Sequence, residues 1–504
     1  MTRLLLIFLA VAGSAFAGSN VLLIIADDFG VDSQALYNPT AGATAPTPNL
    51  NGLAASGIRF TNAWACPVCS PTRACLITGR HGFRTGVGEA VSAAAANGLT
   101  AAELTLPEVI AQSSTASRQT ACFGKWHLST GTPASSATAP NAIGGWPHYA
   151  GATGGVLTSY TNWTKVTNGI SANSTAYATT DVVNDATAWI TARTNANQPW
   201  LAWVAFNAPH APFHNPPANL HSFGANPATN LLKYRAAVEA MDTEIGHLLT
   251  SVNPATTTVI FMGDNGTPGQ VIQSPYDSTH ANDTLYEGGI RIPLIIRGPG
   301  ITPGRTSDAL VHAVDLFSTQ LALAGVPLPT AVTLDSRSLV PLLTGQSTAI
   351  RSRLYTDQFD QSDPTSGGRA LRDDRVKLIR YHNGTEVFHD LLTDPAESAN
   401  LLANGIPAMS ATHQALYYRL RFNLGQYTTA ASLEPTHPAF TPPGFSLTVP
   451  ETPAASQTLW QSTDLDFWTP VPGVTSSRND GQLTFTAPHS TSPRVFYSIL
   501  TEVP

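Results

Sequence analysis

Short apolar runs that alternate with helical patterns constrain the fold of this chain more than any other feature. Residues 21–26, 200–206 and 257–262 are almost wholly apolar and short, which is typical of strands buried on both faces of a sheet. Between them, Leu106–Gln112 and residues 234–249 carry apolar side chains at helical spacing. This alternation predicts an α/β sandwich with a large mixed, mostly parallel sheet.

Carboxylates stand directly after two of the expected strands. Asp27 and Asp28 follow the first, and Asp264 and Asn265 follow residues 257–262. Taken alone, the first pair could equally cap a helix or close a turn. Ligands of open α/β sheets lie at the carboxyl ends of strands, and buried carboxylates need a compensating charge. The four side chains are therefore predicted to hold a hard cation, Ca²⁺ or alternatively Mg²⁺.

The N-terminus is typical of a secretory signal peptide. Arg3 precedes an apolar run at residues 4–12, and Ala15-Phe16-Ala17 provides a small-residue cleavage site. The run is too short to span a bilayer. We expect cleavage after Ala17, a secreted or periplasmic protein, and no membrane span.

Composition divides the rest of the chain. Residues 18–345 form the expected catalytic domain, and strand-like pieces at Val376–Tyr381 and 386–389 predict a small antiparallel C-terminal subdomain over 346–428. A Pro/Thr/Ala-rich stretch at 429–450 predicts a linker. Residues 451–504 are predicted to form an appended small β module.

The strands expected in this module are 457–462 and 483–486, with a hairpin turn at 479–481. Its core is expected to contain Trp460, Trp468, Phe496 and Tyr497, with carbohydrate-binding aromatics as the alternative. Only 12% of all residues are charged and the net charge is −7, so nucleic acid is not an expected partner.

The segment Cys66-Pro67-Val68-Cys69-Ser70-Pro71-Thr72-Arg73 admits several interpretations. A C-x-x-C pair is found in redox sites and in halves of zinc sites, but a zinc site needs a second pair that this chain lacks. Cys69-x-Pro71-x-Arg73, followed by Leu76-x-Thr78-Gly79-Arg80, resembles the signature of the formylglycine-dependent (type I) sulfatases of the alkaline phosphatase superfamily. We expect Cys75 and Cys122 to be buried thiols.

Further segments, covering about residues 20–425, resemble sulfatase blocks and occur in the order of that family. They are Asn20-Val21 through Asp27-Asp28, Thr47-Pro48-Asn49-Leu50, Gly124-Lys125-Trp126-His127-Leu128, Ala208-Pro209-His210, Met241-Asp242, Gly263-Asp264-Asn265-Gly266, Glu287-Gly288-Gly289-Ile290-Arg291-Ile292-Pro293 and Arg372-Asp373 to Lys377-Leu378-Ile379-Arg380. The resemblance implies an alkaline-phosphatase-like sandwich fold.

The resemblance also implies that a maturation enzyme converts Cys69 to formylglycine, which hydrates to a gem-diol. One hydroxyl attacks the sulfate ester, and the second expels sulfate as the carbonyl re-forms. The modified residue would also be a metal ligand. By the same resemblance, Arg73 holds the diol and the ion, and Lys125 binds sulfate. His127 helps to deprotonate the diol, and His210 protonates the leaving alcohol.

One position departs from the family pattern. Asn282 stands where sulfatases usually have a lysine that grips sulfate opposite the metal. A neutral amide cannot supply charge, so a weaker anion clamp is expected unless His280 or Arg291 substitutes. All three are candidate substrate-binding residues.

The sequence thus predicts a secreted sulfatase that hydrolyses sulfate esters of a sulfated small molecule or glycan, with carbohydrates as the expected substrates. A phosphodiesterase or phosphonate monoester hydrolase of the same superfamily is the enzymatic alternative. A catalytically weakened binding homologue is the third.

Overall fold

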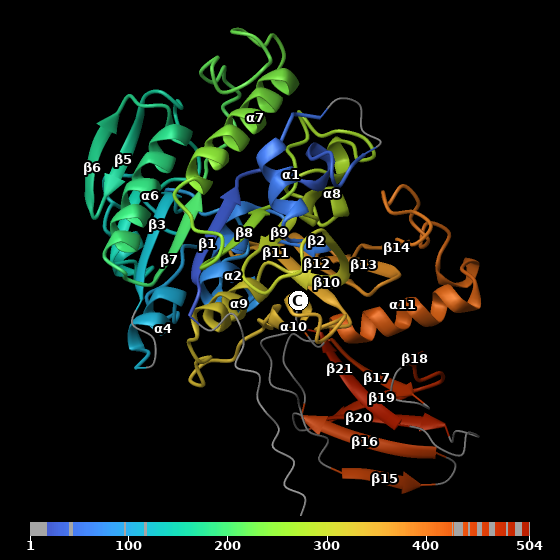
Figure 1. Ribbon diagram of the computed structural model, residues 1–504. Coiled ribbons are helices and arrows are strands. Elements are labelled where there is room, and N and C mark those ends of the chain that lie inside the picture. Colours follow the sequence, from blue (N-terminus) through green and yellow to red (C-terminus); the bar gives the residue numbers. More distant parts are fainter. Residues whose placement is uncertain are drawn as a thin grey trace, which may run out of the picture.

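The computed structural model describes residues 18–39, 44–94, 97–114, 118–425, 427, 437–441, 444–450, 456–462, 469–479, 482–488 and 496–502. A ten-stranded mixed sheet forms its centre (Figure 1). The strand order is β10 (Arg305–His312), β2 (Ile58–Trp64), β9 (Leu294–Arg297), β8 (Thr257–Gly263), β1 (Asn20–Ala26), β7 (Trp200–Ala205), β3 (Gln119–Lys125), β4 (His148–Ala152), β5 (Trp163–Thr167) and β6 (Ile170–Ser174).

The middle of this sheet is parallel. β1 pairs in parallel with both β7 and β8, and β3 pairs in parallel with β7 and β4. Antiparallel pairing occurs where β9 joins β8 and β2, and where β5 and β6 extend the sheet beyond β4. The strands expected at 21–26, 200–206 and 257–262 correspond to β1, β7 and β8.

Both faces of the sheet are covered by helices, as buried parallel strands require. Leu22 and Ile24 of β1 pack on the side of α1 (Pro48–Ala55), α6 (Ala178–Asn195) and α7 (Asn230–Leu249). Leu23 and Ile25 pack on the opposite side, against α2 (Cys69–Thr78), α4 (Leu106–Gln112) and α9 (Asp315–Ala324). Figure 1 shows this layered arrangement, so the predicted sandwich is confirmed.

Short helices lie in the connections. They are α3 (Gly82–Thr85), α5 (Ala139–Ala142), α8 (Glu287–Ile290) and α10 (Val340–Leu343), with 3-10 turns at Val31–Ser33, Ser278–His280 and Ile406–Ala408.

The smaller antiparallel sheet expected from the sequence is present. It contains β11 (Leu354–Asp360), β12 (Asp363–Arg372), β13 (Val376–Tyr381) and β14 (Glu386–Asp390), in that order. Helix α11 (Ala411–Leu424) covers it, and its Leu416 and Leu420 pack with Leu378 and Phe388 of the sheet.

Two small sheets follow α11. One has the order β15 (His437–Thr441), β16 (Gly444–Pro450), β20 (Gln482–Pro488) and β19 (Thr475–Asn479); the other has β18 (Thr469–Pro470), β17 (Ser456–Ser462) and β21 (Phe496–Glu502). Trp460 of β17 is fully buried and packs against Phe422 of α11, which makes it a core residue. Trp468 lies outside the described residues, as do the side chains of Phe496 and Tyr497.

Two details of this module differ from the sequence prediction. β15 and β16 lie within residues 429–450, expected to be a linker, and β16 pairs with β20. Proline is compatible with this placement because Pro438 lies on the edge strand β15 and Pro450 ends β16. The second difference concerns the hairpin. The strand that precedes β20 in it is β19 and not the strand at 457–462, because Asn479 pairs with Gln482. Residues 480 and 481 of the turn lie outside the described residues.

The predicted signal peptide, residues 1–17, also lies outside the described residues. Within the part of the chain that the structure describes, no helix combines the length and apolar character needed to cross a bilayer.

Candidate active site

The parallel pairing of β1 with β8 brings the two carboxylate-bearing strand ends together. Ala26 is in register with Gly263, so Asp27-Asp28 and Asp264-Asn265 leave the sheet side by side. All four residues are buried, and the backbone N–H of Asp28 donates to Oδ1 of Asp264 at 3.0 Å. The structure therefore gathers the four oxygen-bearing side chains that the sequence predicts as metal ligands.

Two buried cations face these carboxylates. The Lys125 ammonium lies 2.8 and 2.6 Å from the two carboxylate oxygens of Asp27 and 3.4 Å from the sulfur of Cys69. Nη2 of Arg73 lies 2.7 Å from Oδ2 of Asp264, and its Nη1 donates to the Lys125 carbonyl. Lys125 is the last residue of β3, and Arg73 lies one turn into α2.

Three carboxylates here meet only two cations, so one negative charge stays uncompensated. Burial, the largest cause, together with Asp27 raises the pKa of Asp264 to about 6, although Arg73 and Lys125 lower it. Oδ1 of Asn265 is buried and has no hydrogen-bond partner among the described residues. An unpaired carbonyl oxygen beside surplus carboxylates is the donor set of a hard divalent cation. The residues present therefore fit Ca²⁺ or Mg²⁺.

Asp28 connects this cluster to the cavity wall. Its backbone is left-handed, with φ 64°, a region that aspartate tolerates better than most residues. Its Oδ1 accepts hydrogen bonds from the side-chain amides of Asn265 at 2.7 Å and Asn282 at 2.5 Å. The Tyr234 hydroxyl donates to its carbonyl at 2.9 Å. These hydrogen bonds hold Asp28 in a left-handed backbone conformation at the edge of the carboxylate cluster.

Cys69 is the first residue of α2 and is buried. Burial, the largest cause, and the carboxylates of Asp27, Asp264 and Asp28 raise its pKa well above that of an ordinary thiol, although Lys125 lowers it. A redox-active or thiolate nucleophile needs the opposite shift. This electrostatic setting speaks against the redox interpretation of the C-x-x-C pair.

The other three cysteines are also buried free thiols, which confirms the expectation for Cys75 and Cys122. The sulfur of Cys66 lies 3.7 Å from that of Cys75. The Thr72 hydroxyl, at a position where serine is commoner in sulfatases, donates to the carbonyl of Asp264 at 2.7 Å and thereby ties α2 to the end of β8.

His127 lines the cavity above Cys69 as a neutral imidazole. Its Nε2 lies 3.0 Å from the carbonyl oxygen of Val91, so Nε2 carries the proton. Nδ1 is then unprotonated, and it is buried without a hydrogen-bond partner among the described residues. Burial, followed by Lys125 and Arg73, lowers the pKa of His127 well below its ordinary value. Its Nδ1 therefore has a lone pair that no described group uses.

His210 lies on the same cavity, after β7. Its Nδ1 donates to the carbonyl of Ala211 at 2.6 Å, and its Nε2 lies 3.5 Å from Oδ2 of Asp28. The Tyr160 hydroxyl lies 2.8 Å from the His210 carbonyl oxygen, and the ring of Tyr160 stacks on His214 at 3.8 Å. These contacts hold the His210 backbone in place.

The cavity has a volume of about 700 Å³. Its lining includes five of the predicted site residues, which are Asp28, Cys69, His127, His210 and Asn282. His280 and Arg291 are not part of it. The ring of His280 packs 3.9 Å from that of Tyr286, and Arg291 donates to the Thr61 carbonyl.

Among the lining residues absent from the predicted set are two with ionisable side chains, Glu89 and Asp283. Asp283 directly follows Asn282, and that adjacency was the only signal in the sequence that could have identified it. Nothing around Glu89 resembles a catalytic pattern.

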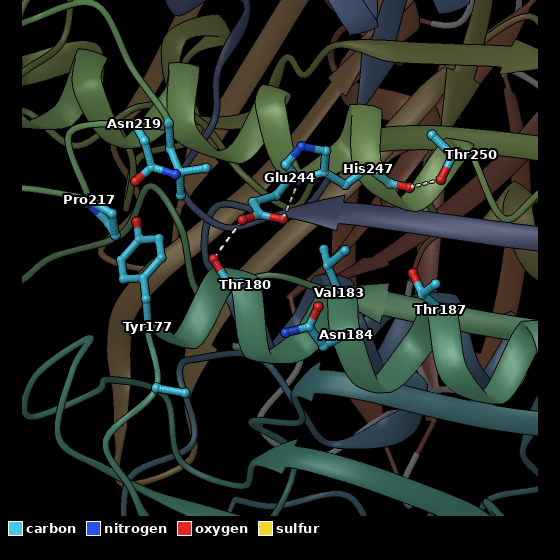
Figure 2. Close-up of a pocket in the computed structure, with 12 residues that line it drawn as sticks. Tyr177, Thr180, Val183, Asn184, Thr187, Pro217, Asn219, Glu244, His247 and Thr250 are labelled. Carbon is cyan, nitrogen blue, oxygen red and sulfur yellow. Dashed lines mark hydrogen bonds and ion pairs between the residues drawn. The ribbon is translucent and has the colours of Figure 1, made fainter.

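A second cavity of about 590 Å³ lies between α6 and α7 (Figure 2). Glu244 in its wall accepts hydrogen bonds from the Thr180 hydroxyl at 2.6 Å and from Nδ1 of His247 at 3.1 Å. None of the predicted site residues lines it. The cavity above Cys69 is therefore the candidate active site.

Comparison with known proteins agrees with this geometry. The sulfatase family model matches residues 19–326, and the C-terminal model of N-sulphoglucosamine sulphohydrolase matches residues 279–423. The chain belongs to the sulfatase family and is an enzyme that hydrolyses sulfate esters.

Among its relatives, human arylsulfatase A is 29% identical over 87% of this chain and 94% of its own length. Arylsulfatase A of Bos taurus is 31% identical over 79% and 82%, respectively.

Solved structures share the fold. Ps i-CgsB in complex with k-i-k-neocarrahexaose has a TM-score of 0.69 at 21% identity, over 81% of this chain and 92% of that one. A protein solved with its substrate D-glucosamine-2-N,6-O-disulfate has a TM-score of 0.63 at 20% identity, over 81% and 97%. The predicted α/β architecture is thus confirmed by independent structures.

Proposed function

We propose that this protein is an exported, calcium-dependent sulfatase of sulfated carbohydrates whose nucleophile is a formylglycine made from Cys69. The observation that carries the proposal is the place of Cys69 at the start of α2, 3.4 Å from the Lys125 ammonium and next to the buried carboxylates of Asp27 and Asp264. A site that raises the pKa of the thiol in this way does not suit a thiolate nucleophile.

The chemistry supplied by the modified side chain is a hydrated aldehyde that attacks sulfur and later releases sulfate as the carbonyl re-forms. Asp27, Asp28, Asp264 and Asn265 would hold the cation, and a cation there would polarise a sulfate oxygen and favour ionisation of the nucleophile. Lys125 and Arg73 balance the charge of this carboxylate cluster.

Proton transfer falls to two histidines on the cavity. Nδ1 of His127 would be the atom that accepts a proton from the modified side chain, because Nε2 is already committed to the Val91 carbonyl. His210 is the group that gives a proton to the leaving alcohol from Nε2, because its Nδ1 is held by the Ala211 carbonyl.

Carbohydrate substrates are supported by the structural neighbours, two of which were solved with a neocarrahexaose and with a glucosamine disulfate. Export is supported by the character of residues 1–17.

Two measurements test the proposal. Peptide mass spectrometry across residues 65–73 should find formylglycine at position 69. A desulfation screen over sulfated mono- and polysaccharides, run beside an aryl sulfate and an aryl phosphodiester, should find sulfate release. Unmodified Cys69 with active enzyme would refute the nucleophile, and faster cleavage of the phosphodiester would refute the substrate class.

A further inference from the structure

Two carboxylates on the wall of the active-site cavity have no role in the chemistry described above. Glu89 and Asp283 line the same cavity as Cys69, His127 and His210. Resting on the proposed function, we propose that Glu89 and Asp283 form an anionic subsite that selects sulfate esters carrying a protonated amine, such as those of amino sugars.

Asp283 is held in place by its backbone. It has φ 68°, in the left-handed region, and its N–H donates to the carbonyl of Pro67 at 3.0 Å, two residues before Cys69. One carboxylate oxygen accepts from the side-chain amide of Gln358 at 2.5 Å. These hydrogen bonds hold Asp283 in a left-handed backbone conformation next to the loop that carries Cys69.

Glu89 carries a negative charge that no residue described by the structure compensates. It is half-buried, and it has neither a hydrogen bond nor an ion pair with any residue that the structure describes. The charges that act on it are those of Asp283 and Asp360, and with burial, the largest cause, they raise its pKa. A cationic group bound between Glu89 and Asp283 would relieve this repulsion.

Apart from the two histidines of the proposed chemistry, the described lining of the cavity offers no cation to a second anionic group on the substrate. No lysine or arginine is among the described residues that line it. Below it, Lys125 is engaged by Asp27 and Arg73 by Asp264. The one unsatisfied buried atom on the lining, Nδ1 of His127, indicates that a ligand completes this cavity. Charge therefore favours an amine over a carboxylate or a second sulfate next to the scissile ester.

Three aryl sulfates that differ only in a para substituent test the subsite: aminomethyl, hydroxymethyl and carboxymethyl. The methylene weakens the effect of the substituent charge on the leaving oxygen. The part that remains is the same for the wild type and the variants, so the change in kcat/KM ratio between enzymes reports recognition. The wild-type enzyme should prefer the amine over the alcohol by about tenfold and should disfavour the carboxylate by a similar factor. The preference should shrink as salt is added, because half-exposed charges are screened.

Glu89→Gln and Asp283→Asn keep shape while removing charge, and asparagine retains tolerance for a left-handed backbone. Each should reduce the amine-to-alcohol ratio about threefold. The matched control is Asp374→Asn, an exposed carboxylate outside the cavity, which should leave the ratio unchanged.

Hydrolysis of all three esters without charge preference would overturn the subsite alone. So would ratios in Glu89→Gln and Asp283→Asn that equal those of the wild type. Failure to hydrolyse any of the three would instead overturn the proposed function, on which the subsite depends.

Discussion

The side-chain amide of Asn282 donates a hydrogen bond to Oδ1 of Asp28. Position 282 is where sulfatases usually have a lysine, and here it joins the cavity wall to an expected metal ligand. Asn282→Lys should strengthen inhibition by inorganic sulfate about five- to thirtyfold, since a charged donor adds about 1–2 kcal/mol near an anion. Inhibition constants measured for the aryl sulfatase reaction check this, and turnover need not rise because sulfate leaves more slowly.

The controls for that variant are His280→Ala and Arg291→Ala. Neither side chain lines the cavity, so both should leave sulfate inhibition unchanged. An unchanged constant in Asn282→Lys, together with a marked weakening in His280→Ala, would mean that the anion clamp has been relocated.

The nucleophile can be tested with two neighbouring cysteines. Cys69→Ala should abolish turnover because it removes the group to be modified. Cys66→Ala should retain most activity, because Cys66 does not line the cavity. Its sulfur lies 3.7 Å from the sulfur of Cys75. Activity is measured on an aryl sulfate after a thermal melt has verified folding. Equal loss in both variants would favour a C-x-x-C mechanism.

Metal dependence has a structural as well as a catalytic readout. Removing the cation should leave the buried carboxylates of Asp27, Asp28 and Asp264 mutually repelling, so a chelator should lower both activity and melting temperature. Ca²⁺ or Mg²⁺ should restore both, and Asn265→Ala should require more cation for the same effect. Restoration by Zn²⁺ alone would contradict an all-oxygen site.

Stability should fall on acidification because of His214. Its Nδ1 donates to the Pro212 carbonyl and its Nε2 accepts from the Tyr177 hydroxyl, both at 3.1 Å. Burial, the largest cause, lowers the pKa of His214 from its ordinary value of 6.5 to about 4. The unfolded chain therefore binds more protons between these values, and the free energy of unfolding decreases as pH falls through that window.

For His214 alone the loss should be about 1–3 kcal/mol. Urea unfolding at pH 7 and pH 5 of the wild type and of His214→Gln measures it. The pKa values of the buried His81, His312 and His389 are lowered as well, and these residues are present in both proteins. Subtracting the pH-dependent change in unfolding free energy of His214→Gln from that of the wild type therefore isolates the contribution of His214. Equal slopes would refute this assignment.

The framework of the fold was predictable because its signals are local. The apolar strands β1, β7 and β8 and the helix α4 follow from hydrophobic pattern and from Pro107 at the start of α4. β15 and β16 were not predicted because their proline content is typical of a linker. Proline at the edge of a sheet or at the end of a strand costs no ladder hydrogen bond, and composition does not show where in a sheet a proline will lie.

The centre of the site was predictable for another reason. Carboxylates at adjacent strand ends and the motif around Cys69 carry their chemistry in the sequence. The positions of Glu89 and Asp283 on the cavity wall depend on how loops pack. The contact of His280 with the ring of Tyr286, away from the cavity, also depends on tertiary packing and not on spacing in the sequence. The proposed specificity subsite therefore lies where sequence patterns are weakest.

Helix α2 has all ten of its residues buried, beginning with Cys69. Any enzyme that acts on Cys69 must therefore reach it before the sheet closes over it. β1 is made early, but its partners β7 and β8 begin at Trp200 and Thr257, far along the chain. At typical synthesis rates the roughly 200 residues between Cys69 and Asp264 take about 10–40 s to emerge. Under the proposed function, the order of strands would leave the segment around Cys69 accessible to a maturation enzyme until the proposed metal-binding edge has been translated.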